Sequence, residues 1–181
     1  MNQLEALVRA HRFVPSKLRT NVSSDLRWSG RKPFLRTAIL SNTLASGPIV
    51  DLCRQELGDD INRVTLNKNL TCEPHRDARS NIGMLSHIMF FGEYDSADGA
   101  GSLVLEDGRQ FIEKKVWHSF DGSALLHWNV PLKPGQGDKW SVVAWRGKTP
   151  RRLISVPNKA ERCSPPSPAD TSSEDGALDD A

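Results

Sequence analysis

The spacing of apolar residues changes at Gly58. Before it, the spacing is helical: Leu4, Leu7 and Val8 predict a short helix near the N-terminus. Residues 48–57 predict a second helix, because a proline occupies its first turn and a glycine follows its last residue. After Gly58 the apolar residues occur in short runs, many of which alternate with polar residues, as in half-buried strands.

Seven such runs predict strands, at 63–70, 84–91, 102–106, 109–113, 116–120, 124–130 and 139–146. The Asp-Gly pair within Glu106–Arg109 predicts a hairpin between two of them. No helical pattern interrupts the series. The sequence therefore predicts a mainly β fold, a sandwich or small barrel, with one or two flanking helices on its N-terminal side.

Composition adds limits to this picture. The chain has 181 residues, 38% hydrophobic and 25% charged, as expected for one ordinary globular domain. No apolar run approaches the roughly 20 residues that span a bilayer, and the N-terminus does not resemble a secretory signal. The three cysteines are scattered, which favours neither a disulfide framework nor a zinc site. We therefore expect an intracellular protein, cytoplasmic or nuclear, that does not associate with a membrane.

Charge divides the chain into three parts. Residues 1–36 hold eight Lys/Arg and two acidic residues, and residues 37–157 hold fourteen of each sign. Residues 158–181 hold two basic and six acidic residues and are rich in Pro and Ser. We expect a basic N-terminal arm that includes the short helix, a β domain, and a disordered acidic tail.

The basic arm has two interpretations. Arg27, Arg31, Lys32 and Arg36 surround Trp28, and a basic segment with an aromatic residue is compatible with nucleic-acid binding. A solvated basic surface explains the same residues.

Candidate chemistry begins at His75-Arg76-Asp77. In an extended segment, residues two apart project to the same side, so His75 and Asp77 can bind one ion. His127, in the middle of the run 124–130, is the candidate third ligand. The alternatives are a surface His beside an Asp in a turn and a core histidine. Two histidines and one carboxylate form the facial triad of non-haem Fe(II) oxygenases.

A basic residue follows this pattern. In the last predicted strand, Lys139 and Ser141 lie on the same side. If that side faces inward, the ammonium and the hydroxyl can bind the distal carboxylate of a 2-oxoacid. The alternative is a solvated lysine at a strand edge.

Several motifs in this order resemble the 2-oxoglutarate/Fe(II)-dependent dioxygenases. They lie between residues 64 and 146 and comprise Thr71–Asp77 with Asn81, Gly99–Val104, Phe120–Gly122 with His127-Trp128 and Pro131, and Gly137–Val143. Because an Asn follows its His-x-Asp, the chain is most similar to the TET/JBP-like nucleic-acid oxygenases and related small oxygenases.

The resemblance implies a double-stranded β-helix (jelly-roll, cupin-like) fold and the use of Fe(II), 2-oxoglutarate and O2 to hydroxylate a C–H bond. It implies that His75, Asp77 and His127 bind Fe(II), that Lys139 pairs with 2-oxoglutarate, that Ser141 adds a hydrogen bond and that Asn81 supports the metal loop. Similar sequences usually have Arg where this chain has Lys139. The substrate stays open, with a nucleic-acid base or a protein side chain favoured. A catalytically inactive jelly-roll binding module and a nucleic-acid-binding protein acting through its arm are the alternative functions.

Overall fold

The computed structural model describes residues 3–16, 22–24, 39–77, 84–133 and 135–147. Several predictions fall outside these residues, namely those for the acidic tail (158–181), for Asn81, and for Arg27, Arg31, Lys32 and Arg36. They stay predictions.

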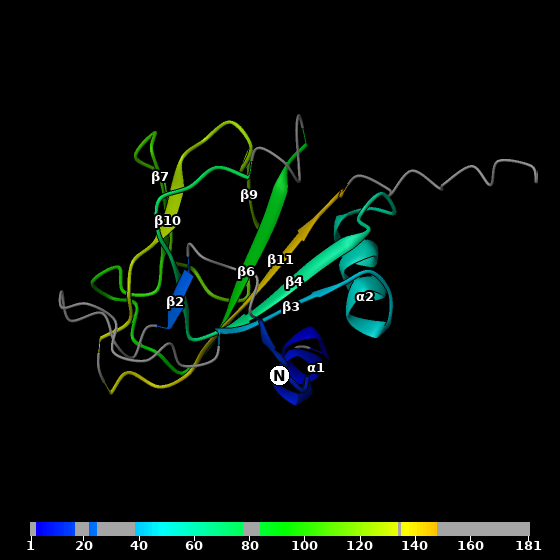
Figure 1. Cartoon of the computed structure of the whole chain (residues 1–181), viewed down its shortest axis with the longest axis horizontal. Helices are drawn as coiled ribbons and strands as arrows, with labels where there is room; N and C mark the ends of the chain where they lie inside the picture. The colour runs from blue at the N-terminus through cyan, green and yellow to red at the C-terminus, as the bar shows by residue number, and fades with distance from the viewer. Residues whose placement is uncertain (1–2, 17–21, 25–38, 78–83, 134, 148–181) are drawn as a thin grey trace, which may run out of the picture. The chain divides into compact units, whose positions relative to one another are not determined.

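The largest element is a six-stranded antiparallel sheet with the order β1-β3-β4-β11-β6-β9 (Figure 1). Its strands are β1 (Pro15–Ser16), β3 (Ile39–Leu44), β4 (Arg63–Lys68), β6 (Ser86–Gly92), β9 (His118–Phe120) and β11 (Lys139–Trp145). The C-terminal strand β11 lies between β4 and β6, and Ser141 is opposite Asn67 on one side and Phe90 on the other. Residues far apart in the sequence therefore share the middle of this sheet.

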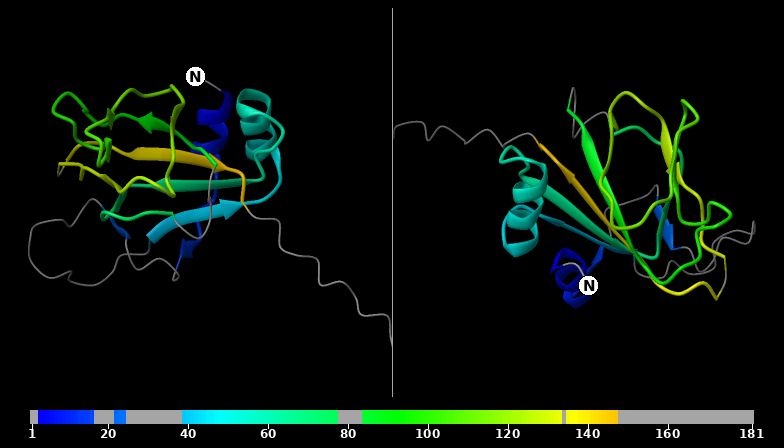
Figure 2. Two further views of the ribbon diagram at one scale, coloured as in Figure 1. Left: turned by 90° about the horizontal axis from the view of Figure 1, so that it is seen from above. Right: turned by 180° about the vertical axis from the view of Figure 1, so that it is seen from behind.

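A second sheet has three strands in the order β10-β7-β8. These are β7 (Leu103–Leu105), β8 (Gln110–Phe111) and β10 (His127–Asn129), and an isolated antiparallel bridge joins His75 to His127 at the free side of β10. A short separate pair joins β2 (Val22–Ser24) to β5 (Leu70–Cys72). The second sheet lies across from the large one in both Figure 1 and Figure 2.

The path of the chain defines the fold. It passes from β4 in the large sheet to the His75 bridge beside the small sheet, then to β6 in the large sheet and β7 in the small sheet. It returns through β8 in the small sheet, β9 in the large, β10 in the small and β11 in the large. The β7–β8 hairpin at the centre of this path is the one predicted from the Asp-Gly pair. This is the winding of a double-stranded β-helix, or jelly roll. The predicted fold class, a mainly β jelly roll with two helices, is confirmed.

The two faces of the large sheet have different partners. Alternate residues of β4, β6 and β11 pack against α1 (Gln3–Ala10) and α2 (Pro48–Leu57) in the main apolar core. This core includes Leu4, Val8, Val50, Cys53, Val64, Leu66, Met89, Phe91, Val142 and Ala144. Figure 2 shows both helices on one side of the sheet and β7 and β10 on the other. The remaining face of the large sheet is thus left to form a site with the small sheet.

Both helix predictions are confirmed. The second helix has the predicted bounds, 48–57, and the first spans residues 3–10. Leu4 and Val8 of the first helix are fully buried, so this part of the N-terminal segment belongs to the core of the β domain. Neither helix, among the residues described, has the length and apolar character that a membrane crossing requires.

The seven predicted strands are present, but most are shorter than predicted, and the run 63–70 is divided into two. The run 63–70 is not a single strand, because Asn69 has a positive φ of 47° and separates β4 from β5. The Asn69 side chain accepts a hydrogen bond from the Lys139 amide at 2.8 Å and donates one to the Asp138 carboxylate at 2.6 Å. These bonds hold the turn through which the chain leaves the large sheet, and asparagine tolerates this conformation better than most residues.

Strand β3 was not predicted at all. Its apolar residues do not alternate regularly, because Ser41 and Thr43 meet polar residues of β4. Ser41 donates a hydrogen bond to Asn67 at 2.9 Å, and the hydroxyls of Thr43 and Thr65 are 2.8 Å apart. Such cross-strand polar pairs stabilise a sheet, but they do not produce the alternation of apolar and polar residues that predicts a strand.

The core position of Cys53 predicts an unreactive thiol. The side chain is fully buried, and this burial, followed by the nearby charge of Glu56, raises the pKa of the Cys53 thiol to about 12. At pH 8 its thiolate fraction is about 10⁻⁴, against about a quarter for an unfolded cysteine. We expect alkylation of Cys53 by iodoacetamide to be about 10³-fold slower in the native chain than in the urea-unfolded chain, measured by peptide mass mapping. Equal rates would contradict this burial.

Candidate metal centre

Three side chains are brought together by backbone pairing between the second sheet and the segment before it. His75 and His127 exchange two backbone hydrogen bonds of 3.0 Å, so the strand pair fixes their side chains next to each other. Asp77 is held by a 2.7 Å hydrogen bond from its amide to the Gly122 carbonyl. The predicted ligands therefore come from three positions that the jelly roll places at one point.

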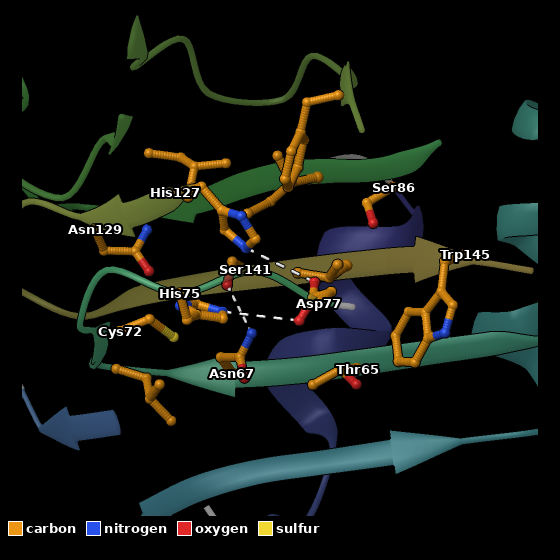
Figure 3. Close-up of a pocket in the computed structure, with 15 residues that line it drawn as sticks. Thr65, Asn67, Cys72, His75, Asp77, Ser86, His127, Asn129, Ser141 and Trp145 are labelled. Carbon is orange, nitrogen blue, oxygen red and sulfur yellow. Dashed lines mark hydrogen bonds and ion pairs between the residues drawn. The ribbon is translucent and has the colours of Figure 1, made fainter. Parts of the chain in front are cut away.

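The donor atoms of these residues face one another. Nε2 of His75 is 3.8 Å from one carboxylate oxygen of Asp77, and Nε2 of His127 is 3.7 Å from the other (Figure 3). One ligand atom from each residue lies within 4.8 Å of the other two. These distances are too long for direct hydrogen bonds. Since the three groups converge without bonding one another, the space between them is suited to an ion.

The second nitrogen of each imidazole is already occupied. Nδ1 of His75 is 2.6 Å from the Glu73 carbonyl, and Nδ1 of His127 is 3.0 Å from the Leu125 carbonyl. A carbonyl can only accept, so each Nδ1 carries the proton of the neutral ring. Each Nε2 then presents its lone pair to the common point. Metal-binding histidines in proteins are oriented in this way.

Burial favours the form of His127 that binds a metal. Only 4% of the residue is exposed, and this burial lowers the pKa of His127, an effect that neighbouring His75 increases. The hydrogen bond to Leu125 and the charge of Asp77 act in the opposite direction but are weaker together. The His127 ring is thus neutral over a wider pH range than a free imidazole, and a metal ion requires the neutral ring.

The geometry accommodates a first-row divalent metal. Two bonds of about 2.0–2.2 Å that meet at one ion join donor atoms up to roughly 4 Å apart. The separations of 3.7 and 3.8 Å, each to a different oxygen of Asp77, fall within that span, and one donor atom from each residue lies within 4.8 Å of the other two. Two imidazoles and one carboxylate on one side of an ion leave its other positions open, as in the facial triad. His75, Asp77 and His127 thus form a group that can hold a metal ion.

A cavity between the two sheets adjoins the three ligands. Its other lining residues come mainly from β4, β6 and β11 and are half polar, namely Thr65, Asn67, Leu70, Cys72, Ser86, Ile88, Leu103, Phe120, Asn129, Ser141, Val143 and Trp145. The inner side of β11 carries Ser141, Val143 and Trp145, which the alternation of that strand places on one side. Open metal positions would face this cavity.

Asn67 is a lining residue that the sequence analysis did not single out. Its side chain donates a hydrogen bond to Ser141 at 3.1 Å (Figure 3). It also accepts one from Ser41 at 2.9 Å. It therefore links three adjacent strands and orients the Ser141 hydroxyl at the cavity wall. The alternation of the predicted strand 63–70 could have placed Asn67 opposite the apolar face formed by Val64 and Leu66.

Lys139 lies on β11 two residues before Ser141, but it does not belong to the cavity wall. The residue is 2% exposed, and its ammonium donates a hydrogen bond to the Gly101 carbonyl at 3.1 Å. Its nitrogen is also 6.0 Å from the centre of the Phe90 ring. The structure thus brings together His75, Asp77, His127 and Ser141 around the cavity, and it buries Lys139 outside the cavity wall.

Comparisons with known proteins give little more. No protein-family model matches the chain, and none of the curated proteins is similar to it in sequence. Among solved structures, the chain is similar to a prolyl-4-hydroxylase from Pseudomonas putida. The identity is 13% over 81% of this chain and 85% of that chain, with a TM-score of 0.48. A likeness this distant assigns no activity, substrate or cofactor to this protein, whose class is therefore defined by its jelly roll and its three converging donor groups.

Proposed function

We propose that this protein is an Fe(II)/2-oxoglutarate-dependent dioxygenase. The observation that carries the proposal is the convergence of two Nε2 atoms and one carboxylate beside a partly polar cavity, with both Nδ1 atoms fixed by carbonyls. The donor set matches the preference of non-haem Fe(II) oxygenases. When bound, Fe(II) and 2-oxoglutarate would supply O2 activation coupled to decarboxylation to succinate, with one oxygen atom entering a substrate C–H bond.

The residues have separate roles in this proposal. His75, Asp77 and His127 hold Fe(II), and the Ser141 hydroxyl, oriented by Asn67, binds the distal carboxylate of 2-oxoglutarate. Lys139 supplies the cation for that carboxylate, which requires its ammonium to turn from the Gly101 carbonyl toward the cavity. Asn81 supports the loop after Asp77.

Apolar groups close the inner side of the site. Phe120 meets the His127 ring edge to face, with 5.0 Å between ring centres, and packs in a second apolar cluster with Ile88, Phe90 and Leu103. Exclusion of water strengthens the electrostatic interactions of bound ligands. Without water, a bound carboxylate can form hydrogen bonds and ion pairs only with the few polar groups of the cavity.

For the substrate, we propose a C–H bond of a nucleic-acid base or a protein side chain. The basic composition of residues 1–36 supports a nucleic acid, which Arg27, Arg31, Lys32 and Arg36 would attract through its phosphates. We further propose that the protein acts inside the cell, in the cytoplasm or nucleus.

The proposed function predicts metal-dependent turnover of the co-substrate. Purified full-length protein with Fe(II), O2 and 2-oxoglutarate should release succinate slowly even without a substrate. EDTA should abolish this release, and excess Fe(II) should restore it, because the ligands are side chains that stay in place without the ion. Succinate measured by mass spectrometry is the readout. If release is the same with and without EDTA, and no metal binds stoichiometrically, the protein is a non-catalytic jelly-roll module.

A further inference from the structure

Arg76 lies between two of the proposed ligands and contacts the segment that leads to the third. It does not line the cavity, and its Nε donates a 2.9 Å hydrogen bond to the Ala124 carbonyl. Its Nη2 donates to both carboxylate oxygens of Glu106, at 2.9 and 2.7 Å. One guanidinium therefore joins the His75–Asp77 segment to two other parts of the small-sheet side of the molecule.

Glu106 completes the connection from the β7–β8 hairpin. One of its oxygens accepts a 3.0 Å hydrogen bond from the Leu126 amide, and its own amide donates to the Leu126 carbonyl at 2.9 Å. The Leu126 bond, followed by the Arg76 guanidinium, lowers the pKa of Glu106. The carboxylate is thus engaged on two sides.

These contacts surround the group that orients His127. Ala124 is bound by Arg76 and Leu126 by Glu106, while the Leu125 carbonyl between them accepts the Nδ1 proton of His127. Fixing residues 124 and 126 fixes the direction of the carbonyl at 125. That carbonyl determines which nitrogen of the His127 ring faces the ion.

We propose that Arg76 and Glu106 are positioning residues of the metal centre, acting together to set the spacing between the His75–Asp77 segment and His127. This inference rests on the proposed metal site, since it concerns how that site is held. The side chains of Arg76 and Glu106 are 46% and 35% exposed. As a surface ion pair they contribute little to folding stability. Their effect falls on the affinity and geometry of the site.

The test is Mn(II) binding to the full-length chain, followed by EPR titration without co-substrate. Loss of an outer partner of a metal ligand typically costs about 10–100-fold in affinity, and we expect this loss for Arg76→Ala. Arg109→Ala is the matched control, because Arg109 forms an exposed ion pair with Asp107 on the same hairpin. Its Mn(II) affinity should stay within about twofold of wild type, as expected for a surface pair.

Two further variants test the cooperation. Glu106→Ala should weaken Mn(II) binding to a similar degree, and the Arg76→Ala/Glu106→Ala double variant should be little weaker than either single one, because both act through residues 124–126. Co(II) absorption spectra should change in the Arg76 and Glu106 variants and not in Arg109→Ala. Thermal unfolding of the metal-free proteins shows that each variant is folded, and Arg76→Lys provides a milder change if Arg76→Ala is not.

The outcomes separate the two proposals. If wild-type protein binds Mn(II) and the Arg76 and Glu106 variants bind it as tightly as Arg109→Ala does, the positioning role is wrong while the metal centre stands. Additive losses in the double variant would also overturn the joint action. If the wild-type chain binds no Mn(II), the proposed function and the positioning role both fail.

Discussion

Asp77→Asn is expected to abolish stoichiometric Fe(II) binding and succinate release. Asp77 supplies the one anionic donor of the three, and its two oxygens face the Nε2 atoms of His75 and His127. An amide offers a neutral oxygen in place of a charged one, so the ion loses both a strong donor and charge compensation. The loss of affinity should exceed the 10–100-fold that removal of an outer partner produces. The measurements are metal content by mass spectrometry and the rate of succinate formation.

His127→Ala should give the same result through a different donor. Because His127 is buried, this variant also leaves a cavity, and its thermal unfolding has to be compared with that of Asp77→Asn, whose side chain is more exposed. His87→Gln is the control, since His87 bonds to Ser119 at 2.8 Å and lies outside the cavity wall. Retention of metal-dependent turnover in either ligand variant, with the His87 control unchanged, would contradict the proposed ligand set.

Lys139→Met is the second variant with a large expected effect. Methionine is unbranched and one atom shorter than the buried lysine side chain, so it keeps most of the packing and removes the charge. If the ammonium pairs with the distal carboxylate of 2-oxoglutarate, loss of a desolvated charge partner costs about 2–5 kcal/mol. We expect KM for 2-oxoglutarate to rise by about 30-fold or more, while Mn(II) affinity without co-substrate stays near that of wild type.

The structure also offers a purely structural role for Lys139, and the same experiment separates the two. The ammonium donates to the Gly101 carbonyl, and the side chain packs closely against Gly101, where an added Cβ would lie 3.1 Å from its Cδ. A structural role predicts a lower unfolding temperature and an unchanged KM. Ser141→Ala, which removes one hydroxyl at the cavity wall, should raise KM by a smaller factor, because one hydrogen bond to a charged group contributes about 1.5–3 kcal/mol.

Several features could be predicted from the chain because their causes are local. The two helices follow from apolar spacing, with a proline and a glycine also marking the bounds of the second, and the Asp-Gly turn produces the β7–β8 hairpin. The two-residue period of a strand puts Ser141, Val143 and Trp145 on one face of β11, and the structure shows that this face lines the cavity. The His-x-Asp spacing also made His75 and Asp77 candidates for one ion.

The convergence of His127 on that pair depended on tertiary structure. His127 is far from His75 in the sequence, and the two meet because His127, in the small sheet, pairs through its backbone with His75, which lies outside the named strands. No local sequence pattern specifies such a pair. The separation of β4 from β5 at Asn69 likewise depends on side-chain bonds to residues of another strand. Asn67 acquired its role only when β3, β4 and β11 came together around it.

The physical reason is the range of the interactions. Propensity, turn chemistry and alternation act between residues a few positions apart, so the helices, the hairpin and the candidate ligands were evident in the order of amino acids. Burial, sheet register and the direction of a carbonyl depend on partners that are distant in sequence. They decided that Lys139 is a buried cation outside the cavity wall, that Arg76 and Glu106 enclose the segment before His127, and that three side chains of an ordinary β domain share one point in space.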